Sequence, residues 1–384
     1  MSPSPRLYAD YNATAPLRPE ARAALTEALS LTGNPSSVHA EGRRARALVE
    51  MARERVAAAI GACRDDIVFT GGGTEAVQAP LRAVLADRPA SLIVSAIEHD
   101  AVLSLAPAHE TWFVSPEGVV DLDSLGNCVA AVAASGQVPV VSLMLVNNET
   151  GVLQPVAAAA DIVHRAGGLI HCDAVQALGK TGVCVTDLDV DYLSVSAHKI
   201  GGPQGVGAFY VRPGAPFRPM QTGGGQEAGR RSGTENVAGI SGFGAAAEAA
   251  LVGLEAYEAL RFARDSMEAA LQKAVPLLSI HGRTAPRVAG VSCFGIEGLP
   301  SETQVMGLDL AKIAVSAGAA CSSGKVKPSR VLTAMGLSDT AARSAIRVSF
   351  GWASQPEDFA ALAGAWLIMA GRARPQLVKL DAHV

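Results

Sequence analysis

Lys199 stands at a place where a lysine is unusual. It follows residues 190–195, whose alternating apolar pattern predicts a strand, and it precedes a glycine-rich bend that begins at Gly201. Lysines mostly lie on solvated faces, because burying an ammonium group costs free energy unless the group is paired or neutralised. Schiff-base formation uses a desolvated lysine, since the reaction needs the neutral amine. Lys199 is therefore a candidate nucleophile.

Three other polar side chains follow buried strands in the same way. His99, Asn148 and Asp173 come at the ends of apolar segments that predict strands. In an open α/β sheet the ligand crevice lies at the carboxyl ends of the strands. We therefore expect these three side chains and Lys199 to surround one crevice.

A glycine-rich turn, residues 71–76, connects a predicted strand at 67–69 with a helix. Free N–H groups at a helix N-terminus bind phosphate, so Gly73 and Thr74 are candidates to hold a single phosphate group. A simple turn is one alternative. A dinucleotide fingerprint is another, because the spacing fits G-x-G-x-x-A. The dinucleotide interpretation is weaker, because Glu98 adjoins His99 in a loop and is a poor partner for a ribose.

Asp173 and His99 each allow two interpretations. Asp173 could cap a helix that starts at Ala174, or it could pair with a protonated ring nitrogen, the role of the acid opposite pyridoxal phosphate. The two interpretations of Asp173 are nearly even. His99 could be a satisfied core histidine. Its place at a strand end favours a ring that stacks on a planar cofactor and moves protons.

Cys321 differs from the other five cysteines, because it lies in a run of small residues, 316–324, that offers no apolar side chains to bury it. That setting predicts an exposed thiol in a mobile loop, and hence a candidate nucleophile. Arg347 lies inside a predicted strand. An arginine in a buried strand usually binds a carboxylate of the protein or of a ligand.

The composition excludes several classes of protein. The 384 residues are 49% apolar and carry a net charge of −4, which gives no electrostatic case for binding nucleic acid or a membrane surface. The first six residues lack the apolar core of a signal peptide, so the cytoplasm is the expected location. The six cysteines form no CxxC pair, and we expect no catalytic metal.

Short apolar strands alternate with helices up to about residue 211, which predicts an α/β fold with a mostly parallel sheet covered on both faces. Helices are expected at 19–29, 41–60 and 157–166, and an alanine-rich helix throughout 239–274. The remaining residues contain shorter strands and predict a smaller α+β domain.

Taken together, these segments resemble the cysteine desulfurases of iron–sulfur cluster assembly, which are fold-type-I pyridoxal phosphate enzymes of the class V aminotransferase family. The resemblance covers almost the whole chain. Its motifs lie at residues 8–14, 33–39, 98–99, 147–151, 173–176, 196–199, 231–234, 317–323 and 346–349.

The resemblance implies a role for each matching residue. Lys199, His99 and Cys321 would be catalytic, with Lys199 bonded to the cofactor and Cys321 receiving the sulfur as a persulfide. Arg347, Asn148 and Asn34 would bind the substrate. The cofactor would be held by Gly73, Thr74, His99, Asn148, Asp173, Gln176, Ser196, His198, Lys199 and Thr234, with Thr234 reaching the phosphate from the second subunit of a homodimer.

The implied activity is conversion of L-cysteine to L-alanine, with the sulfur passed to an acceptor or scaffold protein. A selenocysteine lyase or another small-amino-acid enzyme of the same family is the alternative. The implied domains are a large cofactor domain at 15–257, with a seven-stranded sheet, and a small domain of residues 1–14 and 258–384. The chain departs from the family pattern at residues 76–78 and at Ala228.

Overall fold

The computed structural model describes residues 6–105, 110–318 and 328–377, so Cys321 lies outside the described residues. The largest sheet has seven strands in the order β2-β8-β7-β6-β5-β3-β4. Neighbouring strands from β7 to β4 are parallel, whereas β8 is antiparallel to both β7 and β2. The strands are β2 Ile67–Thr70, β3 Ala90–Ser95, β4 Glu110–Trp112, β5 Val138–Met144, β6 Leu169–Asp173, β7 Tyr192–Ser196 and β8 Gly207–Val211. The prediction of a mostly parallel sheet is confirmed.

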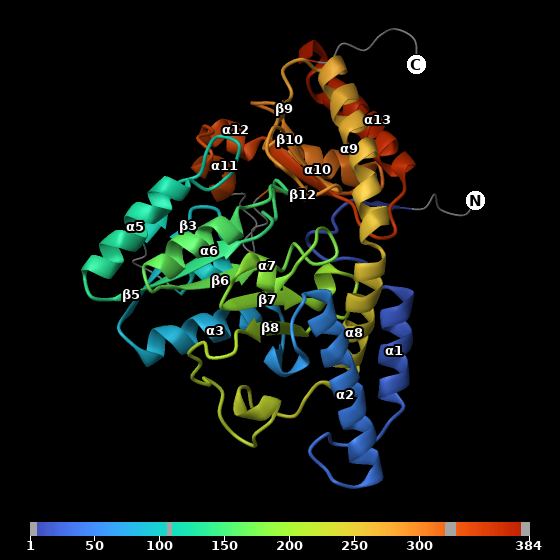
Figure 1. The fold of residues 1–384 in the computed structure, drawn as a ribbon. Helices are drawn as coiled ribbons and strands as arrows, with labels where there is room; N and C mark the ends of the chain where they lie inside the picture. The colour runs from blue at the N-terminus through green and yellow to red at the C-terminus, as the bar shows by residue number, and fades with distance from the viewer. Residues whose placement is uncertain (1–5, 106–109, 319–327, 378–384) are drawn as a thin grey trace.

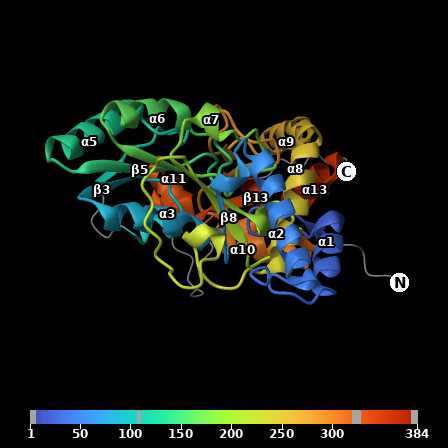
Figure 2. The same cartoon turned by 60° about the horizontal axis from the view of Figure 1, so that its bottom comes forward.

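Helices cover both faces of this sheet (Figures 1 and 2). One face packs against α3 (Gly73–Asp87) and the short α4 (Asp100–Leu103), and the other packs against α5 (Leu122–Ala134) and α6 (Val156–Arg165). Strands β6 and β7 are almost fully buried because they lie between these two layers. Their carboxyl ends carry Asp173 and the segment that leads to Lys199. The other elements of this part are α7 Val185–Leu188 and the 3₁₀ helices Arg64–Asp66, Ala197–Lys199 and Glu227–Gly229.

Three long helices pack beside the sheet: α1 (Pro19–Leu29), α2 (Ala40–Ala59) and α8 (Val237–Val252). Pro19 begins α1, as predicted. Helices α2 and α8 approach so closely that a Cβ on Gly244 would lie 2.6 Å from the Cα of Ala52, so only glycine fits there.

The expectation of one helix throughout 239–274 is wrong. The helical run is divided at Gly253 into α8 and α9 (Leu254–Ala274), and the two are bent by 60°. Glycine stabilises a helix interior poorly, which explains why the break lies there. Among the described helices, none alone is long and apolar enough to cross a membrane, and only the bent pair α8–α9 passes that test together.

A second sheet has four strands in the order β12-β13-β10-β9, all antiparallel. Strand β1 near the N-terminus pairs with β11, which ties the beginning of the chain to this C-terminal part. The predicted division at 15–257 stays a prediction, and the α8–α9 bend lies close to it. The elements are β1 Leu7–Tyr8, β9 Ser279–Ile280, β10 Val291–Gly295, β11 Ile313–Ala314, β12 Ser316–Ala317, β13 Ala345–Ser349, α10 Ser301–Leu310, α11 Arg330–Ala334, α12 Asp339–Arg343, α13 Pro356–Ala373 and the 3₁₀ helix Pro375–Leu377.

Candidate active site

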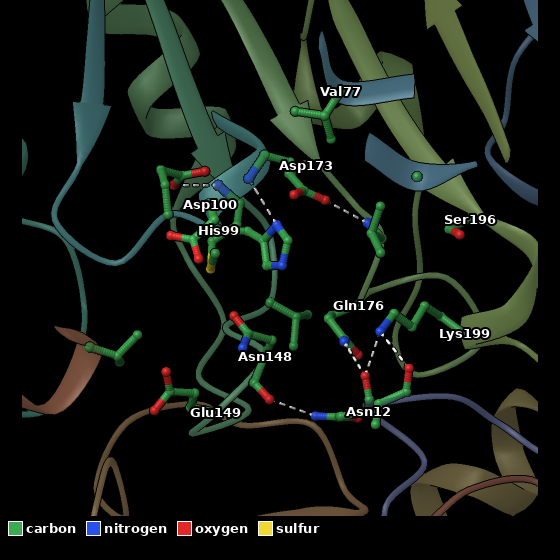
Figure 3. A pocket seen from close by; sticks show the side chains of 18 of the residues that line it. Asn12, Val77, His99, Asp100, Asn148, Glu149, Asp173, Gln176, Ser196 and Lys199 are labelled. Carbon is green, nitrogen blue, oxygen red and sulfur yellow. Dashed lines mark hydrogen bonds between the residues drawn. The ribbon is translucent and has the colours of Figure 1, made fainter. Parts of the chain in front are cut away.

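A cavity of about 610 Å³ lies at the carboxyl ends of the central strands, between the seven-stranded sheet and β12 and β13 of the second sheet. It is lined from segments that are far apart in the sequence (Figure 3). Ten of the thirteen predicted site residues line it: Gly73, Thr74, His99, Asn148, Asp173, Gln176, Ser196, His198, Lys199 and Arg347. The predicted crevice is therefore present.

One end of the cavity has the properties of a phosphate site. Helix α3 begins at Gly73, and no side chain caps its free N–H groups. The hydroxyl of Ser196 is buried beside this terminus and has no hydrogen-bond partner. A Cβ on Gly73 would lie 3.1 Å from the Cβ of Ser196, so the glycine keeps this approach open. Uncapped N–H groups and an unpaired hydroxyl suit an anionic group such as phosphate.

A buried polar chain holds the first turn of α3 over the sheet. Ser194 on β7 donates a hydrogen bond to the carbonyl of Ala76, with an oxygen–oxygen distance of 2.8 Å. Nε2 of His171 then donates to Ser194 over 2.8 Å, and the hydroxyl of Ser142 donates to Nδ1 over 3.0 Å. Burial lowers the pKa of His171 to about 3, so this ring is uncharged at pH 7.

Asp173 lies on the floor of the cavity and is 7% exposed. Its Oδ1 accepts a hydrogen bond of 2.9 Å from the N–H of Val175, as Figure 3 shows. The interpretation of Asp173 as a helix cap is wrong, because residues 175–180 form turns and no helix starts at Ala174. Burial raises the pKa of the Asp173 carboxyl, and a cationic ring nitrogen beside it would stabilise the charged form.

His99 caps the short helix α4 and lines the cavity. Its Nδ1 accepts a hydrogen bond of 3.1 Å from the N–H of Ala101, so the neutral ring carries its proton on Nε2. Gln78 of α3 donates to the carbonyl of the same Ala101, with a distance of 3.1 Å. Through Ala101, Gln78 therefore links α3 to the segment that holds His99, and the sequence did not reveal this link.

Lys199 ends a 3₁₀ turn after β7, and its Nζ donates to the carbonyls of Asn12 and Ala13 over 2.7 and 2.8 Å. Burial, together with the positive charge of Arg347, lowers the pKa of Lys199 to about 8. Burial also lowers the pKa of His198 to about 4, so that this neighbour is neutral at pH 7. Lys199 therefore has the raised fraction of neutral amine that Schiff-base chemistry needs.

Arg347 has the carboxylate partner that its buried strand predicts. Its Nη2 lies 2.7 Å from Oδ1 of Asp10, and its Nη1 donates to the carbonyl of Asn148 over 3.1 Å. Its Nε is buried without a hydrogen-bond partner. The guanidinium is thus oriented by the N-terminal segment and retains a donor that is not used by the protein.

The sequence did not reveal two buried carboxyl groups that line the cavity. Glu98 is 2% exposed, accepts hydrogen bonds from Ser95 and from the N–H of Met144, and is unavailable to a ribose. Burial raises its pKa to about 8. Glu149 accepts a hydrogen bond of 2.5 Å from Ser329, and burial raises its pKa to about 7. In the sequence, Glu98 adjoins His99 and Glu149 adjoins Asn148. This neighbourhood was the one feature that could have predicted their place in the cavity.

Two of the predicted residues that the structure describes, Asn34 and Thr234, do not line the cavity. Asn34 is exposed in the turn between α1 and α2, where its Oδ1 accepts a hydrogen bond from the N–H of Ser36. This turn lies well away from the cavity, so within one chain Asn34 is not placed to bind substrate there. Thr234 is exposed and does not line the cavity either. Cys321 lies outside the described residues.

Comparisons with known proteins agree with this architecture. The family profile described as aminotransferase class-V matches residues 7–362. The cysteine desulfurase of Cereibacter sphaeroides is 44% identical over 364 residues, covering 92% of each chain. The X-ray structure of a NifS-like protein from Rickettsia africae has a TM-score of 0.87 at 30% identity, over 95% of this chain and 99% of the other. A structure of SspA in complex with cysteine has a TM-score of 0.78 at 27% identity, over 90% and 99%.

The chain therefore belongs to the class-V aminotransferases and, within them, to the pyridoxal phosphate-dependent cysteine desulfurases. The residues of the cavity fit that cofactor. An uncapped helix terminus and the unpaired hydroxyl of Ser196 suit its phosphate, a buried carboxylate suits its ring nitrogen, and a lysine of lowered pKa suits its aldehyde.

Proposed function

We propose that this enzyme converts L-cysteine to L-alanine and leaves the sulfur on Cys321 as a persulfide, which a second protein then accepts for iron–sulfur cluster assembly or a related use. The observation that carries the proposal is the convergence of Lys199, Asp173 and His99 on one cavity that also contains the uncapped start of α3 and the unpaired hydroxyl of Ser196. The cysteine held by SspA, a structural relative, supports the choice of substrate.

The cofactor would be bound by several residues that line the cavity. Gly73, Thr74, Ser196 and His198 would hold the phosphate of pyridoxal phosphate, and Lys199 would bind its aldehyde carbon. Once bound, the cofactor supplies an electron sink for the bonds around the substrate Cα. Lys199, with its pKa lowered to about 8, would accept and return the Cα proton near neutral pH.

The remaining side chains would orient the reactants. Asp173 would keep the ring nitrogen protonated, and Gln176 would contact the phenolic oxygen. His99 would stack on the ring and move a proton through Nε2. Arg347 and Asn148, which both line the cavity, would hold the substrate carboxylate. Asp10 would keep the guanidinium aimed at that position.

Sulfur transfer would be carried out by Cys321. Its thiolate attacks the sulfur of the bound cysteine, a new S–S bond forms, and the Cβ–S bond of the substrate breaks. The electron pair of that bond, together with a proton, becomes the third C–H bond of the alanine methyl group. Oxidation of Cys321 to the persulfide level thus balances reduction of the substrate carbon, and no other oxidant is required.

A matched pair of cysteine variants tests this role. Cys321→Ala is expected to keep the absorbance of bound cofactor and to lose sulfide release from L-cysteine. Cys63→Ala removes an exposed thiol and is expected to change neither. Mass spectrometry after addition of cysteine should find one added sulfur atom on Cys321. Full sulfide release by Cys321→Ala would overturn the persulfide mechanism.

The same proposal includes a homodimer in which Thr234 reaches the phosphate in the partner subunit. Its exposure, and its place outside the cavity of its own chain, support a contact made across subunits. Hybrids of a Lys199→Ala chain and a Thr234→Ala chain would test it, because one of the two sites in each hybrid would then contain both native residues. Recovery of about one full site per hybrid is expected. No recovery would exclude the shared site.

We also propose a cytoplasmic location. The described cysteines, Cys63, Cys128, Cys172, Cys184 and Cys293, are all free thiols, which agrees with a reducing compartment.

A further inference from the structure

Lys180 is a buried lysine that lies behind the cavity and has no part in the proposed reaction. It is 4% exposed and lies four residues after Gln176. Its Nζ donates to Oδ1 of Asn12 over 2.6 Å and to Oε1 of Gln176 over 2.5 Å. Burial lowers its pKa, and the positive charges of Lys199 and Arg347 act in the same direction. A lysine kept at such a cost needs a specific reason to be there.

The two side-chain amides around Lys180 have their orientations determined by it. Nζ of Lys180 donates to both amides, so each amide presents its oxygen to it. An ammonium has three N–H donors and a neutral amine has two, so either form can hold both oxygens. Rotation of either amide by half a turn would replace a hydrogen bond with two facing N–H groups.

Because its oxygen faces Lys180, the NH₂ group of Gln176 points toward the cavity wall. One of its N–H groups donates to the backbone carbonyl of Asn12 over 2.9 Å. The amide has a second N–H, and Gln176 itself lines the cavity. Asn12 is fixed in turn, because its own NH₂ donates to the carbonyl of Asn148 over 2.9 Å. Figure 3 shows Asn12, Gln176 and Lys199 meeting at this corner.

We propose that Lys180 is a positioning residue that orients the Gln176 amide so that an N–H group, and not its oxygen, faces the phenolic oxygen of pyridoxal phosphate. This inference rests on the cofactor site of the proposed function. Nothing about the sulfur acceptor or Cys321 enters it.

The orientation has a measurable consequence. A hydrogen-bond donor beside the phenolic oxygen stabilises its anionic form, whereas a carbonyl oxygen in the same place would destabilise it. The proton shared between that oxygen and the nitrogen of Lys199 is then lost at a lower pH. Removing Lys180 frees Gln176 to turn, so the pH at which the absorbance of the bound cofactor changes should rise.

A double-mutant cycle with Lys180→Met and Gln176→Leu tests the proposal on the holoenzyme. We expect Lys180→Met to raise the midpoint of the absorbance titration by about one pH unit, the usual effect of one hydrogen bond to a charged group. In the Gln176→Leu background the same substitution should produce no further shift. Lys273→Met, at an exposed lysine on α9, is the control and should leave the midpoint unchanged.

The cycle separates three other outcomes. An unchanged midpoint in Lys180→Met, even with a loss of thermal stability, would mean that Lys180 is only structural. A shift that persists in the Gln176→Leu background would mean that its charge acts directly, which also overturns the proposal. If wild-type protein binds no pyridoxal phosphate, the proposed function itself fails.

A milder variant keeps the test possible if Lys180→Met does not fold. Lys180→Gln retains an NH₂ group, whose two N–H donors can serve the two oxygens that Lys180 holds, but it lacks the lysine charge. Its midpoint should therefore stay close to that of wild type. A midpoint equal to that of Gln176→Leu would mean that donors at this position do not orient Gln176, which overturns the proposal.

Discussion

The reactivity of Lys199 can be predicted quantitatively from its surroundings. A lysine with its ordinary pKa of 10.5 is about 0.03% neutral at pH 7, whereas a pKa of about 8 makes it about 10% neutral. Lys199 therefore has roughly 300 times as much reactive amine at pH 7 as a solvated lysine. Covalent capture of pyridoxal phosphate by the apoprotein should rise with pH and level off above about pH 8.

Two neighbouring charges act on this pKa in opposite directions. The guanidinium of Arg347 lowers it, and the carboxylate of Asp10 raises it. Arg347→Gln should therefore raise the pKa of Lys199 and slow capture at pH 7, whereas Asp10→Asn should lower the pKa and speed capture. A change of about one pH unit, or about tenfold in rate at pH 7, is the size expected for one nearby charge in a partly buried site.

Stopped-flow absorbance after mixing apoprotein with pyridoxal phosphate would measure these rates. The midpoint of the pH profile is the quantity to compare, because it does not depend on how tightly the phosphate is held. Arg283→Gln, at an exposed arginine that does not line the cavity, is the control and should not move the midpoint.

Two results would refute the reasoning. A wild-type midpoint near 10.5 would mean that Lys199 is solvated in the apoprotein. Shifts of the same sign in Arg347→Gln and Asp10→Asn would mean that the two substitutions act by disturbing the N-terminal segment and not through their charges.

Three further predictions concern stability and cofactor affinity. Gly73→Ala should weaken binding of pyridoxal phosphate about tenfold in an absorbance titration, because its Cβ would lie 3.1 Å from the Cβ of Ser196. Gly126→Ala is the control, because a Cβ there would lie in open space on α5. It should leave the affinity unchanged and stabilise the fold by about 0.5–1 kcal/mol. Burial raises the pKa of Glu98 to about 8, so the folded state holds a proton that the unfolded state loses near pH 4.5, and the free energy of unfolding falls as pH rises between these values. Over that range, the free energy of unfolding of Glu98→Gln apoprotein in urea should increase by about 1–3 kcal/mol relative to that of wild type. A difference that stays constant with pH would contradict the buried charge. Arg287→Met should cost about 3–5 kcal/mol in the same assay, because it strands the buried carboxylate of Glu268, and a loss below about 1 kcal/mol would show that water reaches this pair.

The sequence predicted the central sheet well where local pattern decides the structure. Strand β2 was predicted to within one residue of its observed bounds, and Asp173 ends β6 as expected, because short apolar runs between turn residues leave few alternatives. Strand β4 was not predicted, and the helical run through Gly253 was predicted to be continuous. Strand β4 forms by pairing with β3, which periodicity does not contain, whereas the helix break lies at a glycine whose effect the prediction did not include.

The cofactor side of the site was predictable, whereas its supports were not. Lys199, His99 and Asp173 follow strands, and the parallel sheet brings strand ends together. Asn12 and Lys180 have no such local signal. They meet across 168 residues of chain, and their roles arise only from which hydrogen-bonding atoms are placed opposite each other.

The N-terminal segment connects the earliest and latest parts of the chain, and this has a consequence for biosynthesis. The N–H of Asn12 donates to the hydroxyl of Ser349, and β1 pairs with β11. Closing so long a loop costs conformational entropy that is recovered only when both ends are present. During synthesis on a ribosome, Lys199 would thus be present long before the carbonyls of Asn12 and Ala13 are fixed beside it. Capture of the cofactor in its final geometry must await residue 349, so chains interrupted earlier would lack a complete site.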